Sequence, residues 1–220
     1  MSQVNKKLLL KNTIFLYIRM IFILLVSLYT VRAVLDLLGV EDYGIYNVVG
    51  SIVGMLTFLN GTLATSSQRF FSVALAKKDF QELNKYFCLN LTVFGLFTVI
   101  LVLIAETIGI WFINTKLTIP VERLFAANVV FHFSIISCAV SIIRVPYSAL
   151  VIAHEKMGAF AYIGIYEAIF KLVVVLVLSL IKWDKLIVYG ILMFFSSVSV
   201  SWLYYWYTKK HFPEARFRLF

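Results

Sequence analysis

Residues 12–37 read NTIFLYIRMIFILLVSLYTVRAVLDL, an apolar stretch that includes two arginines and one aspartate. A helix needs about 20 mostly apolar residues to cross the hydrocarbon core of a bilayer. This stretch is long enough, and comparable stretches follow it along the chain of 220 residues. The sequence therefore predicts an all-α protein of the membrane and not a soluble globular domain.

The composition agrees with that prediction. Hydrophobic residues make up 62% of the chain and charged residues 14%, whereas soluble domains are about half apolar and about a quarter charged. The net charge of +9 is not gathered in a basic stripe on a soluble face, so we expect cytoplasmic loop charge and no binding of nucleic acid. Cys88 and Cys138 lie inside apolar runs, which predicts reduced, buried cysteines without a disulfide.

The pattern predicts a polytopic bundle of six transmembrane helices over residues 12–208. An N-terminal segment, 1–11, and a basic tail, 209–220, flank the bundle. Between the first two helices we expect a short turn at Leu38–Asp42, with Gly39 as the C-cap. The expected helices span about Asn12–Leu37, Tyr43–Ala76, Asn84–Ile113, Glu122–Ala153, Gly158–Ile181 and Lys185–Thr208.

The distribution of lysine and arginine predicts the orientation. Cytoplasmic loops carry an excess of these residues, and a cytoplasmic N-terminus gives eleven on the inside and four on the outside. Both termini are therefore expected in the cytoplasm. The inside residues are Lys6, Lys7, Lys11, Lys77, Lys78, Lys85, Lys156, Lys209, Lys210, Arg216 and Arg218, and the outside residues are Lys116, Arg123, Lys182 and Lys185.

Two pairs of opposite charge lie within the predicted spans. A charge at the centre of a membrane helix costs about 2.5–3.5 kcal/mol on insertion scales, so each such charge needs a partner or a function. Arg32 and Asp36 are four residues apart, as are Glu167 and Lys171, so each pair can neutralise itself along one helix face. The alternative is a functional role, in which Asp36, Glu167 or Lys171 senses a coupling ion.

Three arginines in the spans have no such neighbour. Arg19, Arg69 and Arg144 all fall in the cytoplasmic half of the predicted bundle. Arginine is permanently charged and binds phosphate oxygens through two parallel hydrogen bonds. We expect them to converge on an inward-facing polar cleft that binds a phosphorylated or pyrophosphorylated substrate, the alternative being that their side chains snorkel to the interface. The expected polar lining of the cleft is Asn47, Ser51, Ser137 and Ser141.

Signals for enzymatic chemistry are missing from the sequence. There is no Walker A loop, no ligand cluster with metal spacing, and no arrangement typical of a nucleophilic triad. The predicted loops are too short to hold a soluble catalytic domain. We therefore expect a protein that is not an enzyme and uses no cofactor or metal.

Several short motifs are spread over nearly the whole chain. They are LGVEDYGIYN at 38–47, FLNG at 58–61, SQRF at 67–70, IPVER at 119–123, VPYSAL at 145–150, AHEKM at 153–157 and HFPE at 211–214. In sequence and in order these motifs resemble those of one known family, the polysaccharide (O-antigen type) flippases of the multidrug/oligosaccharidyl-lipid/polysaccharide exporter superfamily.

The resemblance implies a helical transporter with two lobes of six helices around a central cationic cavity. Members of the family move undecaprenyl-pyrophosphate-linked oligosaccharides across the bacterial inner membrane for the synthesis of lipopolysaccharide and other surface polysaccharides. Transport proceeds by alternating access and is coupled to an ion gradient. The substrate that the family implies agrees with a phosphate-binding role for Arg19, Arg69 and Arg144.

Family members are longer than this chain, which would correspond to the N-terminal lobe. Its expected partners are the lipid-linked oligosaccharide, membrane lipids, a second transporter half, and polysaccharide polymerases or glycosyltransferases. Two alternatives remain open. One is a multidrug exporter of the same superfamily, although an acid-rich cavity would then be expected. The other is a non-transporting scaffold for a polysaccharide assembly complex.

Overall fold

The computed structural model describes residues 3–215, except for the side chains of residues 3–9, 11, 58 and 59. Within that range every regular element is a helix and no strand occurs. The all-α fold class is thus confirmed. The elements are α1 Gln3–Ala76, α2 Phe80–Ile104, the π-helical turn η1 Ala105–Gly109, α3 Ile110–Thr115, α4 Val121–Ala153, α5 Met157–Leu180 and α6 Lys185–His211.

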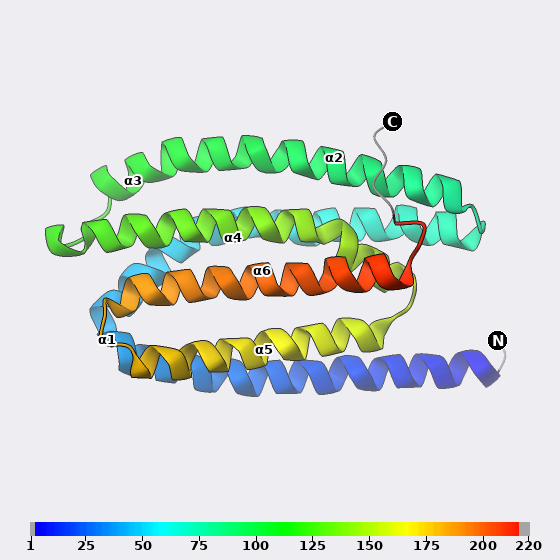
Figure 1. The fold of residues 1–220 in the computed structure, drawn as a ribbon, viewed down its shortest axis with the longest axis horizontal. Helices are drawn as coiled ribbons and strands as arrows, with labels where there is room; N and C mark the ends of the chain where they lie inside the picture. Colours follow the sequence, from blue (N-terminus) through cyan, green and yellow to red (C-terminus); the bar gives the residue numbers. More distant parts are fainter. Residues whose placement is uncertain (1–2, 216–220) are drawn as a thin grey trace.

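Gly39 bends α1 sharply and divides it into a first arm, residues 3–38, and a second arm, residues 40–76. Its φ of 80° and ψ of 167° interrupt the helical conformation, in a backbone region that is essentially limited to glycine. The second arm runs back in the opposite direction (Figure 1). The expected turn at Leu38–Asp42 is therefore wrong in its extent, because the reversal needs one residue and the helix resumes at once.

Five of the described helices are long and apolar enough to cross a membrane. They carry many large apolar side chains on their outer surfaces, such as Leu24, Leu28 and Leu176, each at least half exposed. Soluble monomers rarely present such continuous apolar surface, and these helices are compatible with a multi-pass membrane protein. Six crossings remain a prediction, because α1 counts here as one helix.

Capping aspartates set the starts of two helices, one of them earlier than expected. Asp79 accepts hydrogen bonds from the backbone amides of Gln81 and Glu82, so α2 begins at Phe80, one turn before the expected Asn84. The same expected helix is interrupted near its other end by η1, and α3 continues it to Thr115. At the start of α6, Asp184 accepts from the amides of Leu186 and Ile187, and this helix begins at Lys185 as predicted.

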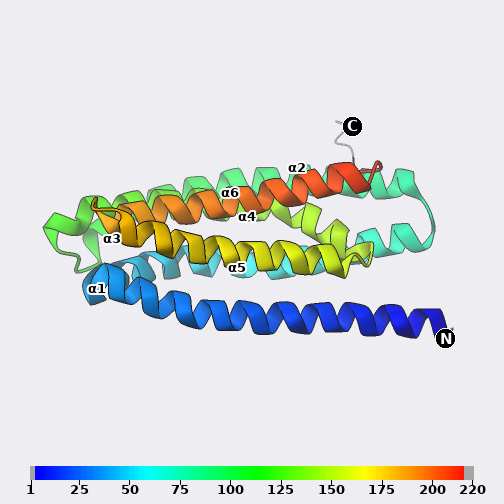
Figure 2. The ribbon, with the colours of Figure 1, turned by 60° about the horizontal axis from the view of Figure 1, so that its bottom comes forward.

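Successive helices alternate in direction, so the connections gather at two ends of the bundle (Figures 1 and 2). The links at 77–79 and 154–156 lie at the same end as the start of α1 and the end of α6, and we call it the terminal end. The bend at Gly39 and the links at 116–120 and 181–184 lie at the other, the bend end. Among the predicted inside charges, Arg216 and Arg218 and the side chains of Lys6, Lys7 and Lys11 lie outside what the structure describes.

Helix α4 is central and packs against the second arm of α1, α2 and α6. Its fully buried Phe131, Ile135 and Ile142 belong to the largest apolar core cluster. The first arm instead packs on α5, where Val34 and Leu178 are buried together. Figure 2 shows this arm and α5 as neighbours at one side of the bundle. The first arm and α5 together form one side of the bundle. The candidate site lies between them and the remaining helices.

A clamp of charged residues fixes the bend end. Arg123, at the start of α4, lies 3.0 Å from Asp42 and 2.7 Å from Asp184. Asp42 is buried, and Lys185 also donates a hydrogen bond of 3.2 Å to the carbonyl of Leu37. The bend and the starts of α4 and α6 are thereby tied together.

At the terminal end, the start of the tail folds back over the link between α4 and α5. Phe212 is 3% exposed and stacks on the His154 ring, with 4.0 Å between ring centroids and 13° between planes. His154 Nε2 lies 3.0 Å from a carboxylate oxygen of Glu214. The Asn84 amide donates to the Glu214 carbonyl, so residues 212–215 connect α2, α4 and α6.

The glycine at the bend gives the first test. Gly39→Ala places a side chain at φ 80°, where we expect a loss of about 1–3 kcal/mol of stability, although nothing lies within 4 Å of the new methyl group. Gly44→Ala is the matched control, because Gly44 is helical and its surroundings are equally open. Thermal unfolding in detergent measures both variants. Equal melting temperatures for Gly39→Ala and Gly44→Ala would contradict the assigned role of the bend.

Docking of the tail should depend on pH. Burial lowers the pKa of His154 and outweighs the opposing attraction of the Glu214 carboxylate. The docked form therefore favours neutral imidazole, so docking is strongest above the ordinary histidine pKa of about 6.5 and weakens as pH falls below it. Hydrogen exchange of residues 212–215, corrected for intrinsic rates, should accelerate on acidification. His154→Gln should abolish this pH dependence and His211→Gln should retain it; protection that grows with acidification would contradict the mechanism.

Candidate functional site

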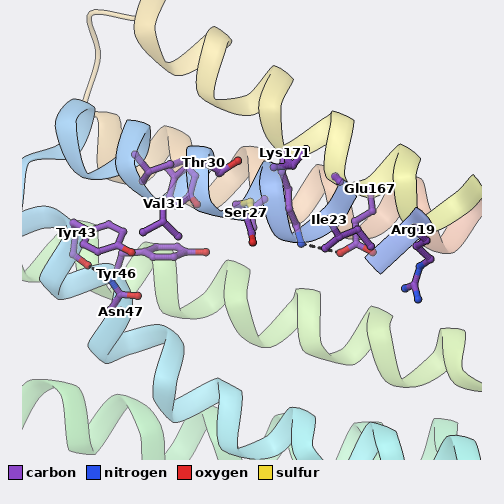
Figure 3. Close-up of a pocket in the computed structure, with 16 residues that line it drawn as sticks. Arg19, Ile23, Ser27, Thr30, Val31, Tyr43, Tyr46, Asn47, Glu167 and Lys171 are labelled. Atoms are coloured by element: carbon purple, nitrogen blue, oxygen red, sulfur yellow. Dashed lines mark hydrogen bonds and ion pairs between the residues drawn. The ribbon is translucent and has the colours of Figure 1, made fainter. Parts of the chain in front are cut away.

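A polar cavity lies between the first arm of α1, the start of its second arm, α5 and α6. Its volume is about 430 Å³. Figure 3 shows Arg19, Glu167 and Lys171 toward one end of the cavity and Tyr43, Tyr46 and Asn47 at the other. The polar residues that line it are Arg19, Ser27, Thr30, Tyr43, Tyr46, Asn47, Glu167, Lys171 and Tyr189.

A second cavity, of about 260 Å³, adjoins the first. The two share Tyr46, Glu167, Lys171 and Met193 as lining residues, and we refer to them together as the double cavity. The second cavity extends toward α4 and α6 and is lined mainly by small and hydroxyl-bearing side chains. Its further polar residues are Thr57, Ser134, Ser137, Ser141, Arg144, Ser196 and Ser197.

The Glu167–Lys171 ion pair lies where the two cavities meet. Lys171 Nζ donates to Glu167 Oε1 at 2.9 Å, so the pairing predicted from the spacing of four residues is confirmed. The positive charges of Arg144 and Arg19 also stabilise the Glu167 carboxylate. One carboxylate is therefore paired with one lysine, and two arginines from other helices line the same double cavity.

Arg19 is held against α5 and does not extend away from the bundle. Its guanidinium lies 4.3 Å from the centroid of the Phe160 ring, and its Nε is buried, with no hydrogen-bond partner in the described part of the chain. It fits only because Gly164 has no side chain, since a Cβ there would overlap Nε of Arg19. The close approach to Gly164 directs the charge into the first cavity.

Arg144 reaches the double cavity from the opposite side. It lies on α4 and lines the second cavity, with its guanidinium 5.9 Å from the centroid of the Tyr204 ring on α6. Arg144 and Arg19 therefore line adjoining parts of the double cavity. Two of the three arginines predicted for the cleft thus come together.

Arg69 does not join them, and the prediction that all three arginines share one cleft is wrong. Its side chain is exposed, and it lines neither part of the double cavity. The buried residues on this part of α1 are Ser67, Phe71 and Ala74, which define the face turned to the bundle. Arg69 lies two residues after Ser67, and so about 200° around the helix from it.

The predicted polar lining is found in part. Asn47 lines the first cavity, and its amide donates to the Tyr43 carbonyl at 2.8 Å. Ser137 and Ser141 line the second, where the Asn60 amide donates to the Ser141 hydroxyl at 2.9 Å. Ser51 is exposed, donates to the carbonyl of Asn47 and lines neither cavity, because the helix turns it outward.

The predicted pair of Arg32 and Asp36 is not formed. Both side chains are exposed on the first arm, and the ion pairs of the described residues do not include one between them. Of the three candidates for sensing a coupling ion, Asp36 lies away from the double cavity, whereas Glu167 and Lys171 line it.

Several residues that line the double cavity were not predicted from the sequence. Ser196 and Ser197 belong to a serine-rich run in α6, SSVSVS at 196–201, and hydroxyls within an apolar span could have indicated a polar face. The lining tyrosines, Tyr43, Tyr46 and Tyr189, could not be recognised as part of a polar face, because tyrosine is common near the ends of spans. The Tyr46 and Tyr189 rings meet edge to face at 4.6 Å, and buried Thr30 has a hydroxyl without a partner in the described range.

Comparisons of this chain with family models, with curated proteins and with solved structures give no match. The function of the site therefore has to be argued from its chemistry. The double cavity offers two arginines and a lysine, one carboxylate, and a lining of hydroxyl and amide groups. Such a set of groups favours binding of an anion that also carries hydrogen-bonding groups.

The contact at Gly164 can be tested directly. Gly164→Ala should push the Arg19 guanidinium away from α5, because its Cβ would occupy the position of the side chain. Gly158→Ala is the control on the same helix, since nothing lies within 4 Å of a Cβ there. We expect Arg19 to react several-fold faster with phenylglyoxal in Gly164→Ala than in Gly158→Ala, measured by mass spectrometry. Equal rates would show that α5 does not hold the arginine.

Proposed function

We propose that this chain is one lobe of a flippase that moves undecaprenyl-pyrophosphate-linked oligosaccharide repeat units across the bacterial inner membrane for surface polysaccharide synthesis. The observation that carries the proposal is the convergence of Arg19, Lys171 and Arg144 on adjoining cavities inside an apolar helical bundle. The sequence motifs that resemble the polysaccharide flippases support the same reading.

The cost of charges in a membrane explains why this convergence matters. A cation within a spanning helix is expensive unless it faces a partner or water. Arg19 and Arg144 have no ion-pair partner within the described residues, yet both face the double cavity. A pyrophosphate group offers several oxygens to such cations, and hydroxyl groups such as those of Ser137 and Ser141 suit sugars.

The bundle suits one half of a transporter. We propose that each arm of α1 crosses the membrane separately, because each exceeds the about 20 residues that a crossing needs. The chain then crosses six times, with the terminal end in the cytoplasm as its lysines favour. Transporters of this kind place their site between repeats, so a second lobe would complete the wall of the double cavity.

A multidrug exporter of the same superfamily is less well supported. Its typical substrates are cations, which an acid-rich cavity would attract. The double cavity has an excess of positive charge instead, with Glu167 already paired to Lys171.

Neutralising the two cavity arginines tests the proposal. In Arg19→Gln/Arg144→Gln, affinity for inorganic pyrophosphate should fall about tenfold or more per arginine, because a hydrogen bond to a charged group contributes about 1.5–3 kcal/mol. The control, Arg32→Gln/Arg69→Gln, removes the same charge from exposed positions and should bind as the wild type does. Calorimetry on the purified full chain measures both.

The same variants apply to transport. A flippase-null strain is supplied with this chain, alone and together with the missing half, and surface glycan is quantified. Export should require both halves and should fail with Arg19→Gln/Arg144→Gln. Normal export by that variant would overturn the binding role of these arginines.

A further inference from the structure

Glu167 is the one carboxylate that lines the double cavity among the residues that the structure describes. It lies 2.9 Å from Lys171, and the charges of Arg144 and Arg19 act on it as well. About two thirds of each side chain in the pair is buried. A negative group therefore already occupies the position that an anionic ligand would take beside Lys171.

We propose that Glu167 determines the anion selectivity of the double cavity, retaining ligands with two or more negative charges and excluding singly charged phospholipid headgroups. This inference rests on the proposed function. A flippase of this kind works among membrane phospholipids, whose phosphodiester groups carry one negative charge each. A cationic cavity without a counter-charge would bind them indiscriminately.

The charges in the cavity explain the selectivity. Arg19, Lys171 and Arg144 contribute three positive charges, and Glu167 offsets one of them. A phosphodiester that displaces Glu167 from Lys171 replaces one charge-assisted bond by another and gains little. A diphosphate can also reach Arg19 and Arg144, which lack ion-pair partners within the described chain. The additional negative charge of the diphosphate can pair with these two arginines, because neither of them forms an ion pair with Glu167.

Glu167→Gln tests the inference because it removes the competing charge at almost unchanged volume. Binding of inorganic pyrophosphate and of dimethyl phosphate, a soluble monoanion, is measured by calorimetry on the full chain. Wild type should prefer pyrophosphate. In Glu167→Gln, affinity for dimethyl phosphate should rise about tenfold, which corresponds to about 1.4 kcal/mol, and the preference should shrink. Glu167→Asp keeps the charge and should keep the preference.

Glu106→Gln is the matched control, because Glu106 pairs with His132 at 2.9 Å and lines neither cavity. It should leave both affinities unchanged. If Glu167→Gln fails to fold, Glu167→Gln/Lys171→Gln replaces the pair by two neutral side chains. In that variant a monoanion meets Arg19 and Arg144 without a competing carboxylate, so the preference for pyrophosphate should shrink there too.

The possible results distinguish a failure of the inference about Glu167 from a failure of the proposed function. If wild type binds pyrophosphate through Arg19 and Arg144 but Glu167→Gln and the double variant leave the preference unchanged, Glu167 is a structural partner of Lys171 and the inference fails alone. If wild type shows no binding that depends on these arginines, the proposed function fails first. A larger preference in Glu167→Gln would also overturn the inference.

Discussion

The cost of a charge in a low-dielectric interior constrains this molecule more than any other factor. Most of each helix can face lipid without penalty, but Arg19, Arg144, Glu167 and Lys171 cannot. The structure places all four around one hollow between the first arm with α5 and the remaining helices. Apolar packing alone would allow many arrangements of similar helices, whereas few arrangements bring these four side chains together.

Apolar packing and the charged clamp hold that arrangement in place. Helix α4 anchors the main core through Phe131 and its neighbours, and Arg123 joins the bend to the starts of α4 and α6. Small residues permit the close approaches. Gly190 of α6 lies so close to Val130 of α4 that a Cβ at this position would come within 3.1 Å of Val130 Cγ2. The walls of the double cavity thus belong to a closely packed frame.

Much of the fold could be predicted from the sequence, because long apolar runs and helical spacing are local properties. The Glu167–Lys171 pair followed from a spacing of four residues, and most helix boundaries fell within a few positions. Which face of a helix meets the bundle is not local, so Arg69 was placed in the cleft although it points outward. The clamp at Arg123 and the bond between Asn60 and Ser141 join residues far apart in the chain, and nothing in their own surroundings indicated these partners.

The bend at Gly39 makes the first arm a lever with its pivot at one end. Arg19 lies twenty residues before the pivot, or about 30 Å along the axis, so a rotation of about 10° would swing it through about 5 Å. The clamp at Asp42 lies just beyond the pivot and would stay still. Because Arg19 packs against Phe160 and Gly164 of α5, α5 would move together with the first arm. A small angular change at a single glycine can thus alter the width of the hollow by the diameter of a phosphate group.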